Sequence, residues 1–311
     1  IGLLRNKPTL TNCYATFADC YKLENYITQP TIFEGSNAIT NVSQMFKGDT
    51  ALKAPNGIDG MLDNLTGLTN AEYMFYNCKA LVCAVPNGFF ANNSRLTKLD
   101  GFFGLCSGLT QICDRLFRKE LQDTNTFPSL TQARYMFSGC TNLTGIVSNA
   151  FFLGASELTD LGDGLNTTPW NSAKVFGNLH GFFADTKITG YFDTFLAPLT
   201  KLRNVRGMFY KTSENATLNA TLKNCYYYEG STVMERSNTV SDKLFANNPS
   251  LYQASYFFAN NASLVGCIPP NLYSACKKSI AYLDYAFYNC TGLTGTDLET
   301  GENIGIREEW F

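Results

Sequence analysis

The stretch "YMFSGCTNLTG" at residues 135–145 recurs along the chain, as "YMFYNCKALVC" at 73–83 and as "YAFYNCTGLTG" at 285–295. In each copy a cysteine lies three residues after a phenylalanine and three residues before a leucine. A motif that returns at a regular interval is typical of a repeat architecture, in which each unit buries its apolar side chains against the next. The interval between the copies therefore decides the fold.

The motif aligns nine times along the 311 residues. Most intervals between the motif phenylalanines are 26 to 29 residues, and the longer ones are 34, 46 and 49. The nine phenylalanines are Phe17, Phe46, Phe75, Phe103, Phe137, Phe183, Phe209, Phe258 and Phe287. An apolar residue lies seven positions before each of them, namely Leu10, Ile39, Leu68, Leu96, Leu130, Phe176, Leu202, Leu251 and Ile280. A looser half-motif lies between the anchors, as in "VCAVPNGFFANNSRL" (82–96), so one unit is roughly 28 residues built from two related halves.

The spacing within a unit predicts its local structure. Apolar or small residues of the motif follow one another at i, i+1, i+4 and i+7 from Met136, which predicts a short helix. The β-branched segment at 144–147 predicts a brief strand. Units of this size cannot close a core alone, so neighbours must stack.

We therefore predict a leucine-rich-repeat-like solenoid of about nine rungs of roughly 28 residues, with short β-strands alternating with short helical turns. The alternative is an ordinary globular α/β domain. The solenoid is expected to span 1–311 as a single domain, with insertions at about 159–178 and 212–243, and to be part of a longer protein or assembly.

The recurring cysteine is interpreted as a scaffold residue. The position three residues after each anchor holds Cys20, Asp49, Cys78, Cys106, Cys140, Thr186, Thr212, Asn261 and Cys290. Small hydrogen-bonding residues replace one another there, whereas a nucleophile or metal ligand could not be replaced by threonine without losing its chemistry. We predict a structural ladder at Cys20, Cys78, Cys106, Cys140, Asn261 and Cys290 that satisfies backbone groups. Disulfides between neighbouring rungs, Cys78–Cys106 or Cys106–Cys140, are a less favoured alternative.

Composition restricts the possible chemistry. Charged residues make up 16% of the chain and the net charge is −2, which argues against a nucleic-acid surface built from clustered lysine and arginine. The single histidine, His180, disfavours metal sites and catalytic triads, so we expect no metal and no cofactor. His180 belongs to the column three residues before the anchors, which varies in type and is predicted to face solvent. No apolar run is long enough to cross a bilayer, so no membrane insertion is expected.

The motifs resemble a known family. "SQMFKGDTAL" and "YMFSGCTNLTG" are similar to the "MFxxCxxL" repeats of BspA-like leucine-rich-repeat surface proteins of bacteria. "LVGCIPPNLY" and "LVCAVPNGFF" look like the "LTGxIPxxLF" segments of Bacteroidales proteins, and similar repeats occur in the phages of these bacteria. The resemblance implies extracellular exposure and binding or adhesion, with no catalytic residues to carry over.

Functional residues are expected where the repeat is interrupted, because insertions in solenoids emerge as loops that often carry the binding face. The large aromatic residues of the two insertions are Trp170, Tyr226, Tyr227 and Tyr228, which we take as candidate ligand-binding residues. Packing of the insertions onto the solenoid is the alternative role for them. The pair Asp160 and Asp163 could mimic the two carboxylates of a glycosidase, but its Gly-rich surroundings predict solvated loop carboxylates instead.

The preferred function is a non-enzymatic recognition or adhesion module that binds a cell-surface glycan or protein, as a component of a phage tail fibre or another virion appendage. A bacterial surface adhesin of the same repeat family is the closest alternative. A polysaccharide-degrading enzyme and a purely structural virion protein are the others. The expected partners are the ligand and other subunits of a larger assembly, with copies of the same chain as one option, at a virion or cell surface.

Overall fold

The nine motif phenylalanines form one continuous stack of rings. Neighbouring ring centroids lie 5.4 to 6.1 Å apart, and the ring planes differ by 6° to 30°. Offset stacking at these distances is favourable beyond the burial of apolar area. Each repeat therefore lies directly on the one before it.

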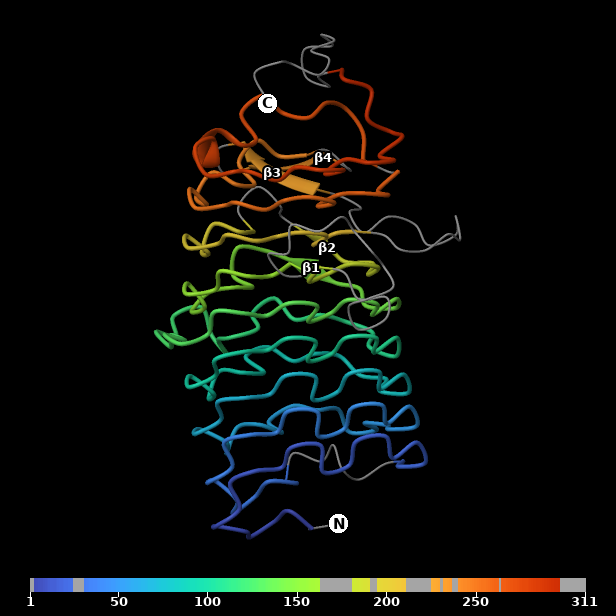
Figure 1. Ribbon diagram of the computed structural model, residues 1–311, viewed down its shortest axis with the longest axis vertical. Coiled ribbons are helices and arrows are strands. Elements are labelled where there is room, and N and C mark those ends of the chain that lie inside the picture. The colour runs from blue at the N-terminus through green and yellow to red at the C-terminus, as the bar shows by residue number, and fades with distance from the viewer. Residues whose placement is uncertain are drawn as a thin grey trace.

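The chain winds through successive coils along one axis, with its N-terminus at one end and its C-terminus at the other (Figure 1). The computed structural model describes residues 3–24, 31–162, 181–190, 195–210, 225–229, 232–236, 240–262 and 264–296. Nearly all the large apolar side chains of the interior belong to a single core that runs the length of the stack. The predicted solenoid is therefore present, as a pile of parallel coils that share one core.

Two parallel ladders join the coils. The first has one bridging residue in each coil: Asn12, Asn41, Asn70, Lys98, Gln132, Asp160, Asn204, Gln253 and Tyr282. The second passes through Ala84, Gln111 and Thr144, and joins Gly266 to Leu293. Each bridging residue of one ladder pairs with its equivalent in the next coil, so the register follows the sequence repeat.

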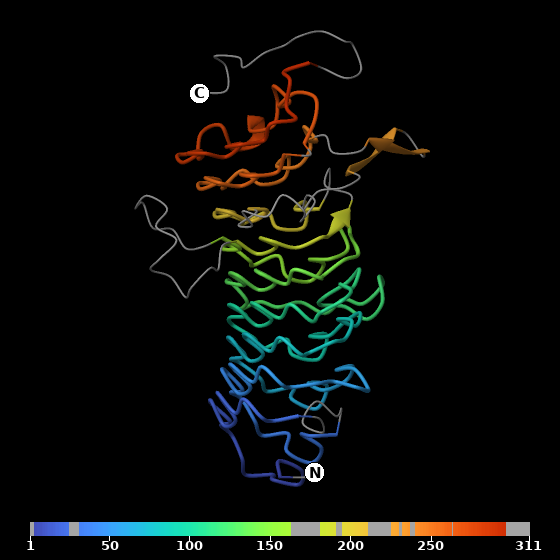
Figure 2. The ribbon, with the colours of Figure 1, turned by 90° about the vertical axis from the view of Figure 1, so that its right-hand side faces the viewer.

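Regular strands are short and belong to the middle of the stack. Strands β1 (Ile146–Val147), β2 (Thr189–Gly190), β3 (Cys225–Glu229) and β4 (Thr232–Arg236) form one sheet in the order β1-β2-β3-β4. The β1–β2 and β2–β3 pairs are parallel, and β3 pairs with β4 in an antiparallel hairpin. This hairpin projects from the side of the stack (Figure 2). Strand β1 lies within the segment 144–147 that was predicted to be extended.

The predicted short helices are wrong. The described residues contain one helix, the three-residue 3-10 helix η1 (Ser274–Cys276). The motif instead forms consecutive hydrogen-bonded turns, such as Met45 N–H to Val42 O and Asp49 N–H to Phe46 O. A backbone in the left-handed region occurs two residues before and two residues after most anchors, as at Gln44 (φ 56°) and Gly48 (φ 81°). Left-handed residues at this spacing end a right-handed helix before it completes a second turn.

One residue of the predicted repeat was assigned incorrectly. Phe176 was aligned as the apolar residue seven before Phe183, and it lies outside the described residues. The structure places the buried Leu158 in that column, two residues before the bridging Asp160, as Leu130 precedes Gln132. The additional residues of this unit therefore enter after the ladder residue and not before it.

Candidate recognition surface

The column three residues after the anchors supplies hydrogen bonds between coils. Cys78 Sγ donates to Phe46 O at 3.1 Å, and Cys106 Sγ donates to Phe75 O at 2.8 Å. The same bond, from each side chain to the anchor carbonyl of the preceding coil, is made by Cys140, Cys290 and Asn261. Each of these side chains supplies a second hydrogen-bond donor to a carbonyl oxygen of a turn within the core. Cys20 belongs to the first coil, and its side chain is exposed.

The ten cysteines whose side chains the structure describes are free thiols. Burial raises the pKa of the Cys140 and Cys113 thiols, so the reactive thiolate is disfavoured at neutral pH. Within the described part of the chain, histidine, cysteine and acidic residues form no group of three that could hold a metal ion.

Asp49 occupies the same column in the second coil and is fully buried. Its Oδ1 accepts the Cys20 N–H at 2.7 Å. Burial raises the pKa of this carboxyl to about 7, although the hydrogen bond from Cys20 opposes the rise and Asp19 adds to it. A protonated Asp49 has the donor that the other members of the column use.

We expect Asp49→Asn to stabilise the protein at pH 8 and to have little effect at pH 4. Between the ordinary carboxyl pKa near 4 and about 7, the folded chain binds more protons than the unfolded chain, so wild-type stability falls as pH rises. The amide is neutral and donates at every pH, as Asn261 does. The gain in the free energy of unfolding should reach about 1 to 3 kcal/mol above pH 7. Urea unfolding across this pH range measures it, with the exposed Asp242→Asn as control, and a gain independent of pH would contradict the assignment.

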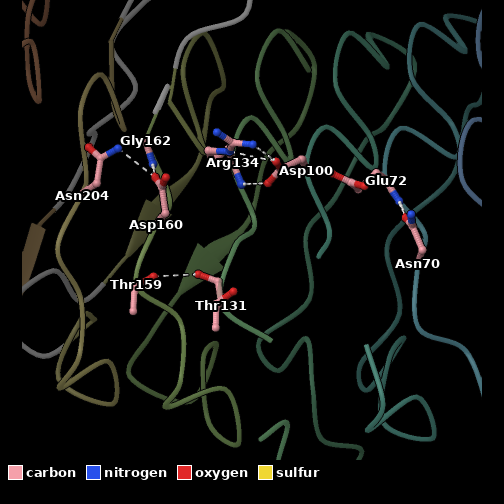
Figure 3. A network of polar contacts seen from close by, with 9 residues as sticks. All are labelled: Asn70, Glu72, Asp100, Thr131, Arg134, Thr159, Asp160, Gly162 and Asn204. Atoms are coloured by element: carbon pink, nitrogen blue, oxygen red, sulfur yellow. Dashed lines mark hydrogen bonds and ion pairs between the residues drawn. The ribbon is translucent and has the colours of Figure 1, made fainter. Parts of the chain in front are cut away.

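The first ladder is reinforced by side chains that fold back onto the backbone. Asn70 Oδ1 accepts the Glu72 N–H at 3.0 Å, and Asp160 Oδ1 accepts the Gly162 N–H at 3.1 Å (Figure 3). Asn204 Nδ2 in the next coil donates to Asp160 Oδ1 at 2.8 Å. Asparagine and aspartate favour such local turns because the short side chain reaches the backbone two residues on. These polar groups are parts of the scaffold.

An ion pair crosses between the fourth and fifth coils. Arg134 donates to the fully buried Asp100 carboxylate from its backbone N–H and from Nε, both at 2.8 Å (Figure 3). Beside it, Thr159 Oγ1 donates to Thr131 O at 3.1 Å. A threonine occupies this position in six coils: Thr11, Thr40, Thr69, Thr97, Thr131 and Thr159. The N-terminal two thirds of this face is therefore a regular polar surface.

Two predictions about this face need correction. The column three residues before the anchors was expected to face solvent, and Tyr14 and Asp284 are exposed, yet Ser43, Asp100, Arg206 and Ser255 are buried. The turns at the ladder residues direct these side chains along the stack, where they contact the neighbouring coils. His180, the member of this column on which the prediction was made, lies outside the described residues.

Asp160 was expected to be a solvated loop carboxylate, and it is 6% exposed. Burial raises its pKa to about 6, while Arg134 and the hydrogen bonds from Gly162 and Asn204 act in the opposite direction. Asp160 is buried because it belongs to the first ladder, and the inserted residues of this unit follow it in the sequence. Asp163, its proposed partner, lies outside the described residues.

The predicted ligand-binding residues are placed only in part. Trp170 lies outside the described residues. Tyr226, Tyr227 and Tyr228 lie in β3, where they pair with Glu235, Met234 and Val233 of β4. The insertion at 212–243 thus contributes a hairpin that continues the second ladder away from the core (Figure 2).

A tyrosine surface covers the last three coils, on the face of the first ladder. It consists of Tyr210, Tyr252, Tyr256, Tyr282, Tyr285 and Tyr288. The Tyr256 and Tyr285 rings stack at 5.0 Å, and Tyr288 meets Tyr285 edge-on at 5.6 Å. Tyr252 meets Tyr282 edge-on at 5.3 Å, and Tyr210 meets Tyr256 at 6.4 Å. Tyr285 and Tyr288 are each 57% exposed.

These tyrosines differ from those of the earlier coils. Tyr73 is buried because its ring covers Gly101 of the next coil, where an added Cβ would lie 2.4 Å from the ring. Tyr256 has the same position in its repeat, but the next coil offers Tyr285 in place of glycine. Both rings consequently stack outward and stay accessible. A tyrosine that packs on a glycine of the next coil is buried, whereas a tyrosine that packs on another tyrosine leaves both rings accessible to solvent.

Polar and cationic groups surround the tyrosine surface. The Arg203 guanidinium lies 6.0 Å from the centre of the Tyr252 ring, and Arg206 lies 5.8 Å from that of Tyr256. Asn289 Nδ2 donates to Asn260 Oδ1 at 3.0 Å. Flat rings beside amide groups provide both apolar contact area and directional hydrogen bonds. Sequence reasoning missed this surface because it looked for aromatic residues only in the insertions.

The comparisons with known proteins provide little beyond this geometry. No protein family matches the chain, and no curated protein matches it. Among solved structures, the TLR13–ssRNA13 complex is matched with 14% identity and a TM-score of 0.18. That match covers 82% of this chain and 40% of the other chain. In the part of the chain that the structure describes, helices long and apolar enough to span a membrane are absent.

Proposed function

We propose that the protein is a non-enzymatic recognition module that binds a cell-surface glycan or protein through the tyrosine surface. The observation that supports this is the change in four columns of the repeat. In the first six coils these columns hold mostly threonine, polar or small residues, with tyrosine only at Tyr73, Tyr76 and Tyr135, whereas in the last three coils they hold mutually contacting tyrosines. Scaffold requirements do not explain the change, because most other coils satisfy the same positions without aromatic rings.

A glycan is the ligand that the surface fits best. The C–H faces of sugar rings stack on aromatic rings, and the stacked Tyr256 and Tyr285 rings of successive coils lie beside the exposed Tyr288 ring of the last coil. Burial raises the pKa of the Tyr256 and Tyr210 hydroxyls, so they remain protonated donors at neutral pH. Tyrosine also dominates protein interfaces, which keeps a protein ligand as the second possibility.

The setting follows from the resemblance to BspA-like leucine-rich-repeat proteins and to the repeats of Bacteroidales phages. On that basis we place the protein outside the cell, in a phage tail fibre or another virion appendage. The alternative is an adhesin on a bacterial surface. Both settings need a long, stable scaffold that presents one face to a ligand, which a stack of coils provides.

The experiment is binding of labelled protein to an array of bacterial capsular and O-antigen polysaccharides, and to intact Bacteroidales cells. We expect Tyr256→Asn/Tyr285→Asn to lose about 10- to 100-fold in affinity, as expected when two contact aromatics are removed. Asparagine is chosen because both residues have φ 57° and asparagine tolerates this backbone. The double variant should therefore keep its unfolding midpoint.

Tyr21→Asn is the matched control, because Tyr21 is 62% exposed and lies in the first coil, away from the tyrosine surface. It should bind as the wild type does. A second variant replaces Trp170, Tyr226, Tyr227 and Tyr228 by alanine. If only that variant loses binding, the ligand site lies in the insertions and the tyrosine surface is excluded. Full binding by both variants would exclude both sites.

A further inference from the structure

The threonine column of the first-ladder face changes to arginine in the seventh coil. In order along the stack, the residues of this column are Thr11, Thr40, Thr69, Thr97, Thr131, Thr159, Arg203, Tyr252 and Ala281. Backbone hydrogen bonds fix the register here. Arg203 N–H donates to Thr159 O at 2.9 Å, and Tyr252 N–H donates to Arg203 O at 2.8 Å. Arg203 therefore occupies a scaffold position at the border of the tyrosine surface.

The scaffold does not require an arginine at this position. Thr159 Oγ1 donates to Thr131 O at 3.1 Å (Figure 3), and three earlier threonines of the column bond to the preceding coil in the same way. The exposed Arg203 side chain instead lies against the following coil, with its guanidinium 6.0 Å from the centre of the Tyr252 ring. Contact with an aromatic ring holds a guanidinium in place and leaves N–H donors at its rim for a ligand.

The acidic residues near Arg203 in the sequence register are occupied by other partners. Glu157 and Asp160 flank Thr159 in the preceding coil. Glu157 forms an ion pair with Lys201 at 2.6 Å, and the buried Asp160 accepts a hydrogen bond from Asn204 at 2.8 Å. Among the residues that the structure describes, no carboxylate forms an ion pair with Arg203. Its charge is therefore available to a ligand.

The tyrosine surface as a whole carries more positive than negative groups. The segments that form it, 203–210, 252–260 and 281–289, contain two arginines and one aspartate, although the net charge of the chain is −2. The second arginine, Arg206, is buried with its guanidinium 5.8 Å from the centre of the Tyr256 ring. The aspartate, Asp284, accepts a hydrogen bond from Ser255 Oγ at 3.1 Å. Both tyrosines of the eighth coil on this surface thus have a guanidinium beside them.

We propose that the glycan is acidic, with a carboxylate or phosphate group on its repeating unit, and that Arg203 determines this specificity by binding the anionic group. The inference rests on the proposed function, because the tyrosines beside Arg203 are the groups that would hold the sugar rings. The N–H groups of a guanidinium form a planar fork that binds two oxygen atoms of a carboxylate or phosphate at once. A sugar stacked on the tyrosines can place such a group at the rim of Tyr252.

The probes are the polysaccharides of the array that carry carboxylate or phosphate groups. Each is compared with the same polymer after its carboxylates have been reduced to alcohols or its phosphates have been removed. The wild type should bind the acidic form about 10-fold or more tightly than the neutral form, as expected for hydrogen bonds to a charged group. The treatment that removes binding identifies which anion Arg203 recognises.

Arg203→Gln should lose about 10-fold in affinity for the acidic polymer and should bind the neutral form as the wild type does. Arg95→Gln is the matched control, because Arg95 is exposed in the fourth coil and its replacement changes the net charge by the same amount. It should bind both forms as the wild type does. The unfolding midpoints of both variants should equal that of the wild type, since both side chains are exposed.

Three results would overturn the inference. The first is Arg203→Gln that binds the acidic polymer as the wild type does, while Tyr256→Asn/Tyr285→Asn loses binding; the proposed function then stands without it. The second is an equal loss by Arg203→Gln on the acidic and neutral forms, which would make Arg203 a positioning residue for Tyr252. The third is a wild type that binds only neutral polysaccharides. A wild type that binds no polysaccharide would overturn this inference and the glycan assignment together.

Discussion

Replacing Phe103 by alanine is expected to lower the free energy of unfolding by about 3 to 5 kcal/mol. Phe103 lies in the middle of the stack and is fully buried. Its ring centroid is 5.7 Å from that of Phe75 and 5.6 Å from that of Phe137, and Phe102 meets it edge-on at 4.6 Å. The vacated volume is surrounded on all sides by coils that are held by two ladders, so it cannot collapse.

Urea unfolding measures the effect, with Phe17→Ala as the matched control. Phe17 is half-buried and has one neighbour in the stack, so its loss should be about half as large or smaller. Because each coil contacts only its neighbours, a central defect should also weaken the coupling between the two halves and broaden the transition. Equal losses at the two positions would show that the stack does not carry the stability of the core.

Replacing Asn93 by leucine is expected to cost about 2 to 3 kcal/mol, although leucine is apolar and similar in size. Asn93 is fully buried in the second half of its unit. Its Nδ2 donates to Leu62 O at 3.0 Å and to Leu65 O at 2.9 Å in the preceding coil. The substitution leaves both buried carbonyls with one hydrogen bond fewer and brings a branched side chain against them.

Asn92→Leu provides the control, because Asn92 is adjacent in sequence and exposed. Its effect on the urea midpoint should be small, as is usual for surface substitutions. The prediction would be wrong if Asn93→Leu matched it. Asn248 makes the same two bonds, to Leu196 O and Leu199 O, and should respond in the same way as Asn93.

The repeat could be predicted from the sequence because side chains in the core obey its period. All nine anchors are found in one stack. Of the predicted ladder residues, Cys20 is exposed, and the others bond to a backbone carbonyl, namely Cys78, Cys106, Cys140, Asn261 and Cys290. The helices were mispredicted because the i, i+1, i+4, i+7 spacing from Met136 also fits a chain of tight turns. The signal that distinguishes the two was present in the sequence. Glycine, asparagine or aspartate lies two residues after most anchors, as at Gly48 and Asn77, and these residues favour the left-handed region.

A second ladder residue was missed for a similar reason. The segment "FANN" occurs at 90–93, 245–248 and 258–261, and its last asparagine is each time a buried donor to the preceding coil. Only the copy ending at Asn261 lies in the main motif, whereas the other two lie in the looser half-motif, for which no ladder position was predicted. The position three residues after the phenylalanine has the same role in both halves of the unit.

The tyrosine surface could not be predicted from the period alone. Its six rings come from coils separated by insertions, and whether a tyrosine is buried or exposed depends on the residue above it in the next coil. Tyr73 and Tyr256 are equivalent in the repeat, but the first lies under Gly101 and the second under Tyr285. Predicting this contrast requires knowing which residues of neighbouring coils pair with each other. The sequence indicated that pairing only where the repeat was regular.

The parallel pairing of neighbouring coils also bears on how the chain is made. Each coil bonds to the next in both directions, as when Val42 N–H donates to Asn70 O and Thr69 N–H donates to Thr40 O. Synthesis proceeds from the N-terminus, so a coil that has formed presents unpaired N–H and C=O groups to the segment that leaves the ribosome next. The protein can therefore fold one coil at a time during translation, each coil serving as the template for the following one.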